Sequence, residues 1–239
     1  IKILNLKKKL QIISFSIKNK SSMIRLIKIK KVKNKYELKI NLNGVSLFFY
    51  SYNINKSHLY NILATLASIC SFVKIKKLNK NIFLKFKIPN GRGDISKIKF
   101  KNKKIYLIDE SYNSNPLSLK TAIENYDKIN VSSNKSKKYL ILGDMLELGK
   151  HSVEQHKLMS KIVNKTKINQ VYVIGNYIKE TFKKIELNKK AKILKNKSDI
   201  FDVINKNLNY NDYLMIKGSN STGLHKISSY LKKRGQYVI

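Results

Sequence analysis

The sequence has 239 residues, which is enough for one large domain or two modest ones. Hydrophobic residues make up 42% of it, a share that excludes a wholly disordered chain. No apolar run approaches the roughly 18 residues of a membrane span. No secretory signal is visible, and the single cysteine, Cys70, excludes a disulfide framework, so we expect a reducing cytoplasm.

The formal net charge of +36 has two possible explanations. A basic chain can bind nucleic acid, but such proteins favour Arg for bidentate contacts, and here all but three of the 50 basic residues are Lys. The Lys residues are spread over the whole length and accompany abundant Ile and Asn, a combination typical of compositional drift. Drift therefore explains the charge better than a nucleic-acid partner does, and the rare Arg residues become more informative.

The first third of the chain predicts strands followed by helices. Segments 11–17 and 36–42 alternate between apolar and polar residues, and Asn43-Gly44 separates the second of them from the apolar run 45–50. Alternation on both sides of Asn-Gly predicts a β-hairpin. Helical spacing of apolar residues then predicts a helix over 58–73 and a shorter one over about 78–86.

The remainder predicts an α/β domain with a mostly parallel sheet. A Pro-Asn-Gly-Arg-Gly break at 89–93 places a domain boundary at about 90–98, and we divide the chain into 1–95 and 96–239. Regular alternation of strands and helices beyond it is typical of a doubly wound, Rossmann-like fold. The predicted strands are 104–109, 138–143, 170–174, 191–194 and 212–216; the predicted helices are 117–127, 151–166, 177–186, 198–207 and 222–233.

Polar residues follow several of these strands, where an open α/β sheet binds its ligands. Asp109 and Glu110 end one strand, and either acid could order a ligand or pair with the next helix. Asn113 and Asn115 follow, and their amides suit a polar ligand, although Asn115 is also well placed to cap a helix that begins at Pro116.

Two further segments suit anionic ligands. Arg92 lies between two glycines, which allow the backbone to approach a ligand closely. Lys217, Gly218 and Ser219 follow a strand and precede a helix, although the Gly-x-x-x-x-Gly-Lys-Ser/Thr phosphate loop does not occur anywhere in the sequence. The four histidines lack metal-ligand spacing, and we expect them at surface positions on helices.

Three segments together resemble the C-terminal part of the Mur ligases. They are Leu-Ile-Asp-Glu-Ser-Tyr-Asn-Ser-Asn-Pro at 107–116, Leu-Gly-Asp-Met-Leu-Glu-Leu-Gly at 142–149 and Lys-Gly-Ser at 217–219. The first two strings are distinctive of the family member that adds D-alanyl-D-alanine. The resemblance covers 57–239 well, whereas 1–56 fits by order and β character only.

The resemblance implies a fragment of an ATP-dependent ligase of peptidoglycan synthesis that acts in the cytoplasm. Its family joins D-alanyl-D-alanine to a UDP-N-acetylmuramoyl-tripeptide through an acyl phosphate, with ATP and Mg²⁺. Residues 1–95 would then be the end of a central ATPase domain without its P-loop, and 96–239 the Rossmann-like C-terminal domain. The complete protein would be a monomer with no nucleic-acid partner and no membrane span.

Roles at matching positions also follow from the resemblance. The expected ATP-binding residues are Asn61, Arg92, Asp109 and Glu110, and those expected to face the dipeptide and the inter-domain surface are Tyr112, Asn113, Asn115, Lys217, Gly218 and Ser219.

The sequence also departs from the family pattern. Ser57 stands where the family usually has His, and His58 where it usually has Asn. The P-loop, the magnesium ligands and the carbamylated lysine of the family are not found, so this chain alone should not catalyse ligation and no catalytic residue is assigned to it. The alternatives are a non-catalytic binding module of the same fold and, less favoured, a basic nucleic-acid binder.

Overall fold

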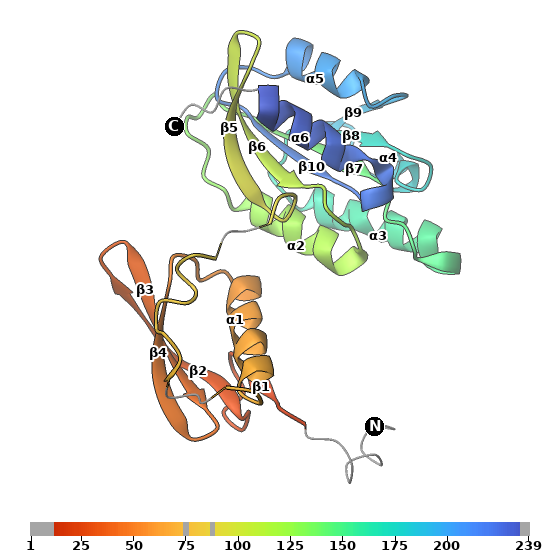
Figure 1. Ribbon diagram of the computed structural model, residues 1–239. Coiled ribbons are helices and arrows are strands. Elements are labelled where there is room, and N and C mark those ends of the chain that lie inside the picture. The colour runs from red at the N-terminus through yellow and green to blue at the C-terminus, as the bar shows by residue number, and fades with distance from the viewer. Residues whose placement is uncertain (1–11, 74–76, 87–88, 235–239) are drawn as a thin grey trace. The chain divides into compact units, whose positions relative to one another are not determined.

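The computed structural model describes residues 12–73, 77–86 and 89–234. The chain divides into two compact units, residues 1–87 and 88–239, each built around its own hydrophobic core (Figure 1). None of the described helices has the length and apolar character that crossing a bilayer requires.

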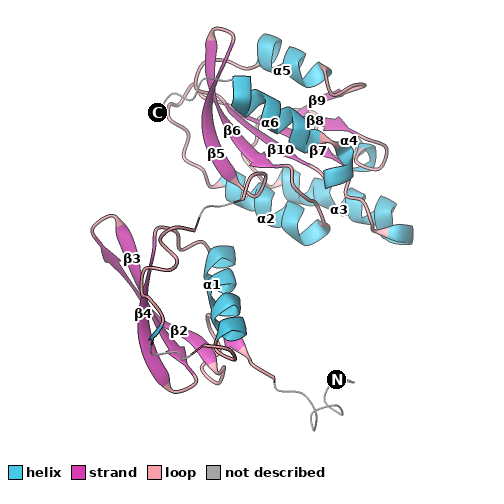
Figure 2. Cartoon of the chain, in the orientation of Figure 1, coloured by secondary structure: helices cyan, strands magenta, loops and turns pink. Residues whose placement is uncertain are grey.

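The first unit is a sheet with a helix packed against one face (Figure 2). Its described strands lie in the order β1-β2-β3-β4, and apolar side chains on the inner face of β3 and β4 pack against Leu63 and Leu66 of the helix. The elements are β1 (Phe15–Ser16), β2 (Ile24–Val32), β3 (Lys35–Leu42), β4 (Val45–Ser51) and α1 (Lys56–Ile69).

The hairpin predicted around Asn43-Gly44 is confirmed by the antiparallel pairing of β3 with β4. Asn43 and Gly44 have φ values of 49° and 93°, as a two-residue hairpin turn requires. Of the alternating segment 11–17, Gln11 lies outside the described residues. Within the described part only Phe15 and Ser16 form a strand, β1, which pairs parallel to β2.

The short helix predicted over about 78–86 is wrong, because these residues form successive turns. The carboxamide of Asn79 accepts a hydrogen bond from the backbone N–H of Asn81 at 2.9 Å, which offers the backbone an alternative to the helix. The carbonyl of Lys80 accepts from the N–H of Tyr50 in β4 at 2.8 Å. Phe83 is still buried in the core, where its ring packs edge to face against Phe49. The turns at this segment therefore bury the Phe83 ring without a helix.

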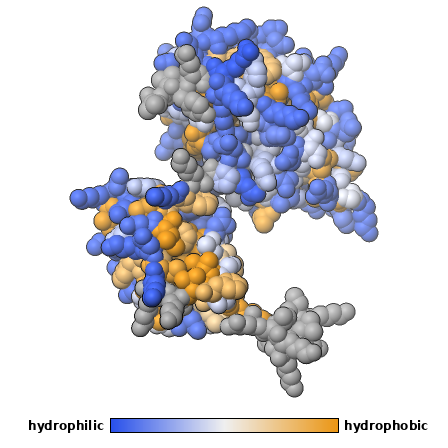
Figure 3. All heavy atoms as spheres, viewed as in Figure 1, coloured by the Kyte–Doolittle hydropathy of each residue, from blue (hydrophilic) through white to orange (hydrophobic). Residues whose placement is uncertain are grey.

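The surfaces of the two units differ in the face that Figure 3 shows. Apolar atoms gather on the first unit, whereas hydrophilic atoms cover most of the visible face of the second. Phe48, Phe72 and Phe86 of the first unit are all strongly exposed. Lysine-rich composition therefore does not give a uniformly polar surface.

The second unit contains, within the described residues, a six-stranded sheet in the order β5-β6-β10-β7-β8-β9. All neighbouring pairs are parallel except β5 with β6, so the predicted mostly parallel sheet is confirmed and gains an antiparallel edge strand that the sequence did not predict. The strands are β5 (Asp94–Phe100), β6 (Lys103–Glu110), β7 (Lys138–Gly143), β8 (Gln170–Ile174), β9 (Lys190–Ile193) and β10 (Tyr213–Lys217).

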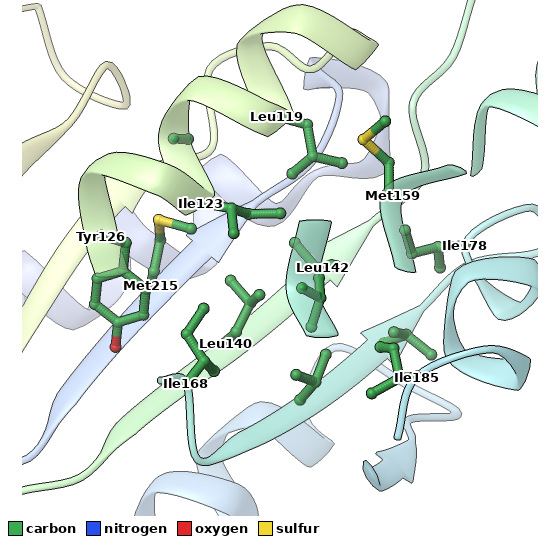
Figure 4. Packing of buried hydrophobic residues seen from close by; sticks show 14 of the residues in the cluster. Leu119, Ile123, Tyr126, Leu140, Leu142, Met159, Ile168, Ile178, Ile185 and Met215 are labelled. Carbon is green, nitrogen blue, oxygen red and sulfur yellow. The ribbon is translucent and has the colours of Figure 1, made fainter. Parts of the chain in front are cut away.

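Helices cover both faces of this sheet and enclose two apolar cores. One core lies against α2, α3 and α4 and includes Tyr126, Leu140 and Met215 (Figure 4). The other lies against α5 and α6 and uses the alternate side chains of the same strands. The helices are α2 (Pro116–Asp127), α3 (Ser152–Asn164), α4 (Lys179–Lys183), α5 (Asp199–Asn207) and α6 (Leu224–Arg234).

Lysine ammonium groups bind the carbonyls at several helix C-termini of this unit. Among the described residues, Lys103, Lys138, Lys189 and Lys190 donate to carbonyls in or just after the last turn of α5, α2, α3 and α4, respectively. The distances run from 2.5 to 3.4 Å. These carbonyls have no partner within the helix, and a cation there also interacts favourably with the helix dipole.

Candidate functional site

The polar residues at the ends of β6 and β10 lie side by side. The two strands are parallel, and Lys217 at the end of β10 is in register with Glu110 at the end of β6. The Lys217 ammonium donates to the carbonyl of Asn113 at 2.8 Å and lies 3.8 Å from Oε2 of Glu110. Strand register thus brings three residues predicted for the site into one cluster.

Burial sets the electrostatics of the Glu110–Lys217 pair. Burial raises the pKa of Glu110, opposed by the positive charge of Lys217. Burial likewise lowers the pKa of Lys217, opposed by the charge of Glu110. Lys217 is only 1% exposed, whereas the Glu110 side chain is 21% exposed. The carboxylate is therefore the member of the pair that a ligand can reach.

Arg92 is held beside this pair by a glycine turn that continues the β5–β6 pairing. The N–H of Gly93 donates to the carbonyl of Asp109 at 2.7 Å, and the N–H of Tyr112 donates to the carbonyl of Gly91 at 3.0 Å. Gly93 has φ +91°, and a Cβ at this position would lie 2.9 Å from Oε1 of Glu110. Glycine here lets the Arg92 turn approach the glutamate closely.

The Arg92 guanidinium lies over the ring of Tyr112, with 4.5 Å between its central carbon and the ring centroid. Tyr112 is itself 45% exposed. A stacked guanidinium and an accessible carboxylate suit a ligand that carries a flat or anionic group together with hydroxyl donors.

Asp109 faces into the unit and is 2% exposed. Its Oδ1 accepts hydrogen bonds from the N–H and the hydroxyl of Ser111, and its Oδ2 accepts from the ammonium of Lys232 on α6 at 2.5 Å. The same ammonium binds Asp94, the residue opposite Asp109 in the β5–β6 register. Asp109 is thus the more buried carboxylate of an Asp94–Lys232–Asp109 triad.

Asn115 caps helix α2, as one of the two sequence interpretations expected. Its side-chain oxygen accepts from the N–H of Ser118 at 2.8 Å, and the Ser118 hydroxyl accepts from the N–H of Asn115 at 3.0 Å, which completes a capping box before Pro116. Asn113 is exposed, and its side-chain oxygen accepts from the N–H of Ser114 at 2.8 Å.

Ser219 joins three of the loops at this edge of the sheet. Its hydroxyl donates to the carbonyl of Ser114 at 3.1 Å and accepts from the N–H of Leu146 at 2.9 Å, while its N–H donates to the carbonyl of Asp144 at 2.9 Å. Gly218, just before it, packs so closely that a Cβ would lie 3.2 Å from the Cα of Gly143. The Lys217–Ser219 turn therefore sets the loop positions from inside the unit.

His156 holds the loop after β7, contrary to the surface position expected for the histidines. Its ring is fully buried; Nδ1 lies 2.6 Å from the carbonyl of Ser152, and Nε2 accepts from the N–H of Met145 at 2.9 Å. His58 in the first unit is buried too, 3.0 Å from the hydroxyl of Ser51. The surface expectation was wrong for both, because the apolar face of each helix contains a histidine bonded to a buried polar group.

The burial of His156 predicts a loss of stability in acid. Burial lowers the pKa of His156 below that of a free histidine, so folding favours the neutral ring. This stabilisation is complete above about pH 6.5 and is lost as the pH falls towards the folded-state pKa. Protonated Nε2 cannot accept from Met145, which should cost about 1–3 kcal/mol.

Urea denaturation at pH 7 and pH 5 measures this effect. His156→Gln keeps a donor and an acceptor but cannot titrate, so its free energy of unfolding should change less with pH than that of the wild type. An equal pH dependence in the two proteins would contradict the prediction. His151→Gln, at an exposed position, is the matched control.

Asn61 lies at an exposed position on α1 of the first unit. Among the residues that the structure describes, no group of three or more His, Cys, Asp or Glu side chains could hold a metal ion. Asp94 and Lys232 were not identified from the sequence; Lys232 carried no signal, because it is one lysine among many.

Comparison with known families and proteins gives a consistent result. The family described as "Mur ligase, glutamate ligase domain" matches residues 96–220. A UDP-N-acetylmuramoyl-tripeptide–D-alanyl-D-alanine ligase from Buchnera aphidicola (subsp. Acyrthosiphon pisum) is 31% identical over 239 residues, covering 92% of this chain and 49% of the relative. A ligase of the same name from Rickettsia prowazekii is 32% identical over 143 residues, covering 60% of this chain and 30% of the relative.

Solved structures share the fold. MurF ligase from Thermotoga maritima, crystallised with ADP, has a TM-score of 0.69 at 18% identity over 96% of this chain and 51% of its own. MurF from Acinetobacter baumannii has a TM-score of 0.72 at 17% identity over 98% of this chain and 49% of its own. The chain thus spans about half the length of these relatives. Since the family match covers more than half of its residues, the chain belongs to the Mur ligase family.

Proposed function

We propose that this chain is the C-terminal part of an ATP-dependent ligase that adds D-alanyl-D-alanine to UDP-N-acetylmuramoyl-tripeptide in peptidoglycan synthesis. The observation that carries the proposal is the similarity to proteins of that name along nearly the whole chain. The reaction would activate the tripeptide carboxylate as an acyl phosphate, which the amine of the dipeptide then attacks. A cytoplasmic location follows from the same proposal.

The Arg92–Glu110 cluster would bind the nucleotide. The guanidinium stacked on Tyr112 suits a phosphate or a flat base, and the accessible oxygen of Glu110 suits a ribose hydroxyl. The complex of the Thermotoga MurF ligase with ADP supports nucleotide binding by proteins of this fold. ATP would supply the phosphoryl group; the residues of this chain would bind and orient it.

Asp109 and Asn61 would have different parts in nucleotide binding. Asp109 would act from behind by fixing the end of β6, because both of its oxygens are occupied within the unit. Asn61 is exposed on α1, and its part in nucleotide binding stays a prediction. The described residues do not fit a magnesium site.

The β6–α2 loop would face the dipeptide. Tyr112 and Asn113 present an exposed ring and an exposed amide. Asn115 and the Lys217–Ser219 turn would hold that loop in place through the helix cap and the carbonyl contacts. Because no phosphate loop occurs in the sequence, we expect ligation only when this chain is part of, or assembled with, a phosphate-binding half.

The test is to express the complete reading frame that contains these residues and to measure phosphate release. We expect release to require ATP, the UDP-linked tripeptide and D-alanyl-D-alanine together. Nucleotide binding without release in the presence of both substrates would support the alternative of a non-catalytic binding module.

Arg92→Lys should impair that enzyme although the charge is kept. A lysine loses the planar fork and the stacking on Tyr112, so we expect the KM for ATP to rise by about tenfold. Arg234→Lys is the matched control, since Arg234 also lies over a tyrosine, 5.2 Å from the ring of Tyr230, but outside the cluster. Equal kinetics for the two variants would exclude Arg92 from the nucleotide site.

A further inference from the structure

We infer that Lys232 is a positioning residue, which holds the Arg92 turn against the end of β6 by binding Asp94 and Asp109 together. The inference deepens the proposed function and rests on it only for the kinetic consequence. The geometric part concerns the protein without ligand.

The two carboxylates need a cation between them. Asp94 and Asp109 are directly opposite each other in the antiparallel β5–β6 pair, and like charges in that arrangement repel. The Asp109 side chain is 3% exposed and that of Asp94 is 21% exposed, so water screens the repulsion poorly. Lys232, 8% exposed, binds one oxygen of each and offsets the repulsion.

The second oxygen of each carboxylate extends this contact to the site. Asp94 Oδ1 accepts from the N–H of Gly91 at 2.9 Å, next to Arg92. Asp109 Oδ1 accepts from Ser111, directly after Glu110. One ammonium on α6 is therefore linked through two aspartates to the backbone on both sides of the Arg92–Glu110 pair.

The alternative is that Lys232 merely attaches α6 to the sheet. That role predicts a loss of stability without a local effect at Gly91 or Tyr112. Positioning predicts that the amides of Gly91 and Tyr112, which fix the turn, become more open when the ammonium is removed.

The experiment compares Lys232→Met with Lys232→Arg and with Lys233→Met, the exposed lysine that follows on the same helix. Hydrogen exchange is measured without nucleotide. We expect the Gly91 and Tyr112 amides of Lys232→Met to exchange about tenfold faster or more, relative to amides in β7, with partial recovery in Lys232→Arg and no change in Lys233→Met. Unchanged relative exchange in Lys232→Met would overturn the inference.

A second variant covers the case in which Lys232→Met does not fold. Asp94→Asn with Lys232→Met removes the like-charge repulsion while keeping an oxygen for Gly91. It should fold and still show faster exchange at Tyr112, because the link between the two segments is lost. Wild-type exchange in this double variant would also overturn the inference.

Kinetics separates the inference from the proposed function. In the complete enzyme, Lys232→Met should raise the KM for ATP by about tenfold while kcat changes less, because the nucleotide contacts are displaced. Faster exchange in Lys232→Met with an unchanged KM for ATP would show that Lys232 fixes the backbone turn but does not affect nucleotide binding. If exchange is faster in Lys232→Met but the wild-type enzyme does not use ATP, the proposed function is refuted and the positioning role remains supported.

Discussion

Replacing Lys217 by Met should lower the free energy of unfolding of the second unit by about 3–5 kcal/mol, the usual effect of removing one partner from a buried ion pair. The ammonium is 1% exposed and binds the carbonyl of Asn113, and the carboxylate of Glu110 lies beside it. Met has a similar length but leaves that carbonyl without its donor. The pKa of Glu110, already raised by burial, should rise further because the opposing charge is gone.

Urea denaturation followed by circular dichroism measures this change. Lys226→Met, at an exposed position on α6, is the control and should lie within about 0.5 kcal/mol of the wild type. In the double variant Glu110→Gln with Lys217→Met, part of the lost stability should return, because no buried carboxylate is left unpaired. Equal losses in the Lys217 and Lys226 variants would show that the buried pair contributes nothing.

The second large effect is expected for Gly175→Ala, which should lower the free energy of unfolding by about 3 kcal/mol or more. Its φ of +137° is a conformation essentially confined to glycine, and a Cβ would lie 2.5 Å from the carboxylate of Asp144. That carboxylate accepts hydrogen bonds from the N–H groups of Asn176 and Ile178 at 2.9 and 2.7 Å. Moving it away would break both contacts at the start of the β8–α4 connection.

Gly149 supplies the matched control for Gly175. It also has a positive φ, +53°, but a Cβ there would meet nothing within 4 Å. Gly149→Ala should therefore cost only the backbone term, about 1–2 kcal/mol. The difference between the two midpoints of thermal unfolding reports the overlap with Asp144 together with the greater backbone strain at φ +137°. A smaller loss of stability in Gly175→Ala than in Gly149→Ala would contradict the predicted overlap with Asp144.

The second unit could be predicted well from the sequence because its local signals agree. Apolar runs such as 138–143 are buried along their whole length, and the Asn-Pro at 115–116 starts α2 where the helix cap was expected. By contrast, β5 was missed. Its alternation of Lys and Ile suits an edge strand, but the preceding Gly-Arg-Gly break predicted a domain boundary over the same residues.

The site residues that could be predicted from the sequence are those at the ends of predicted strands. Residues that follow a strand, such as Glu110 and Lys217, were identified because parallel strands end at one edge. Which of the two acids is buried and which is partly exposed was not predictable, because it depends on a lysine 123 positions away from Asp109. The helix predicted over 78–86 failed for the same kind of reason: a long-range bond from β4 to Lys80 competes with the local pattern.

The lysine ammonium groups at the helix C-termini change how the charge of this protein should be treated in engineering. A less basic variant is the obvious way to limit non-specific adhesion to polyanions, and most of the lysines are exposed candidates for Gln or Glu. Lys103, Lys138, Lys189 and Lys190 are not interchangeable with them, because each donates to backbone oxygens at the end of a helix. Part of the lysine content of this chain is thus tied to the way these helices end.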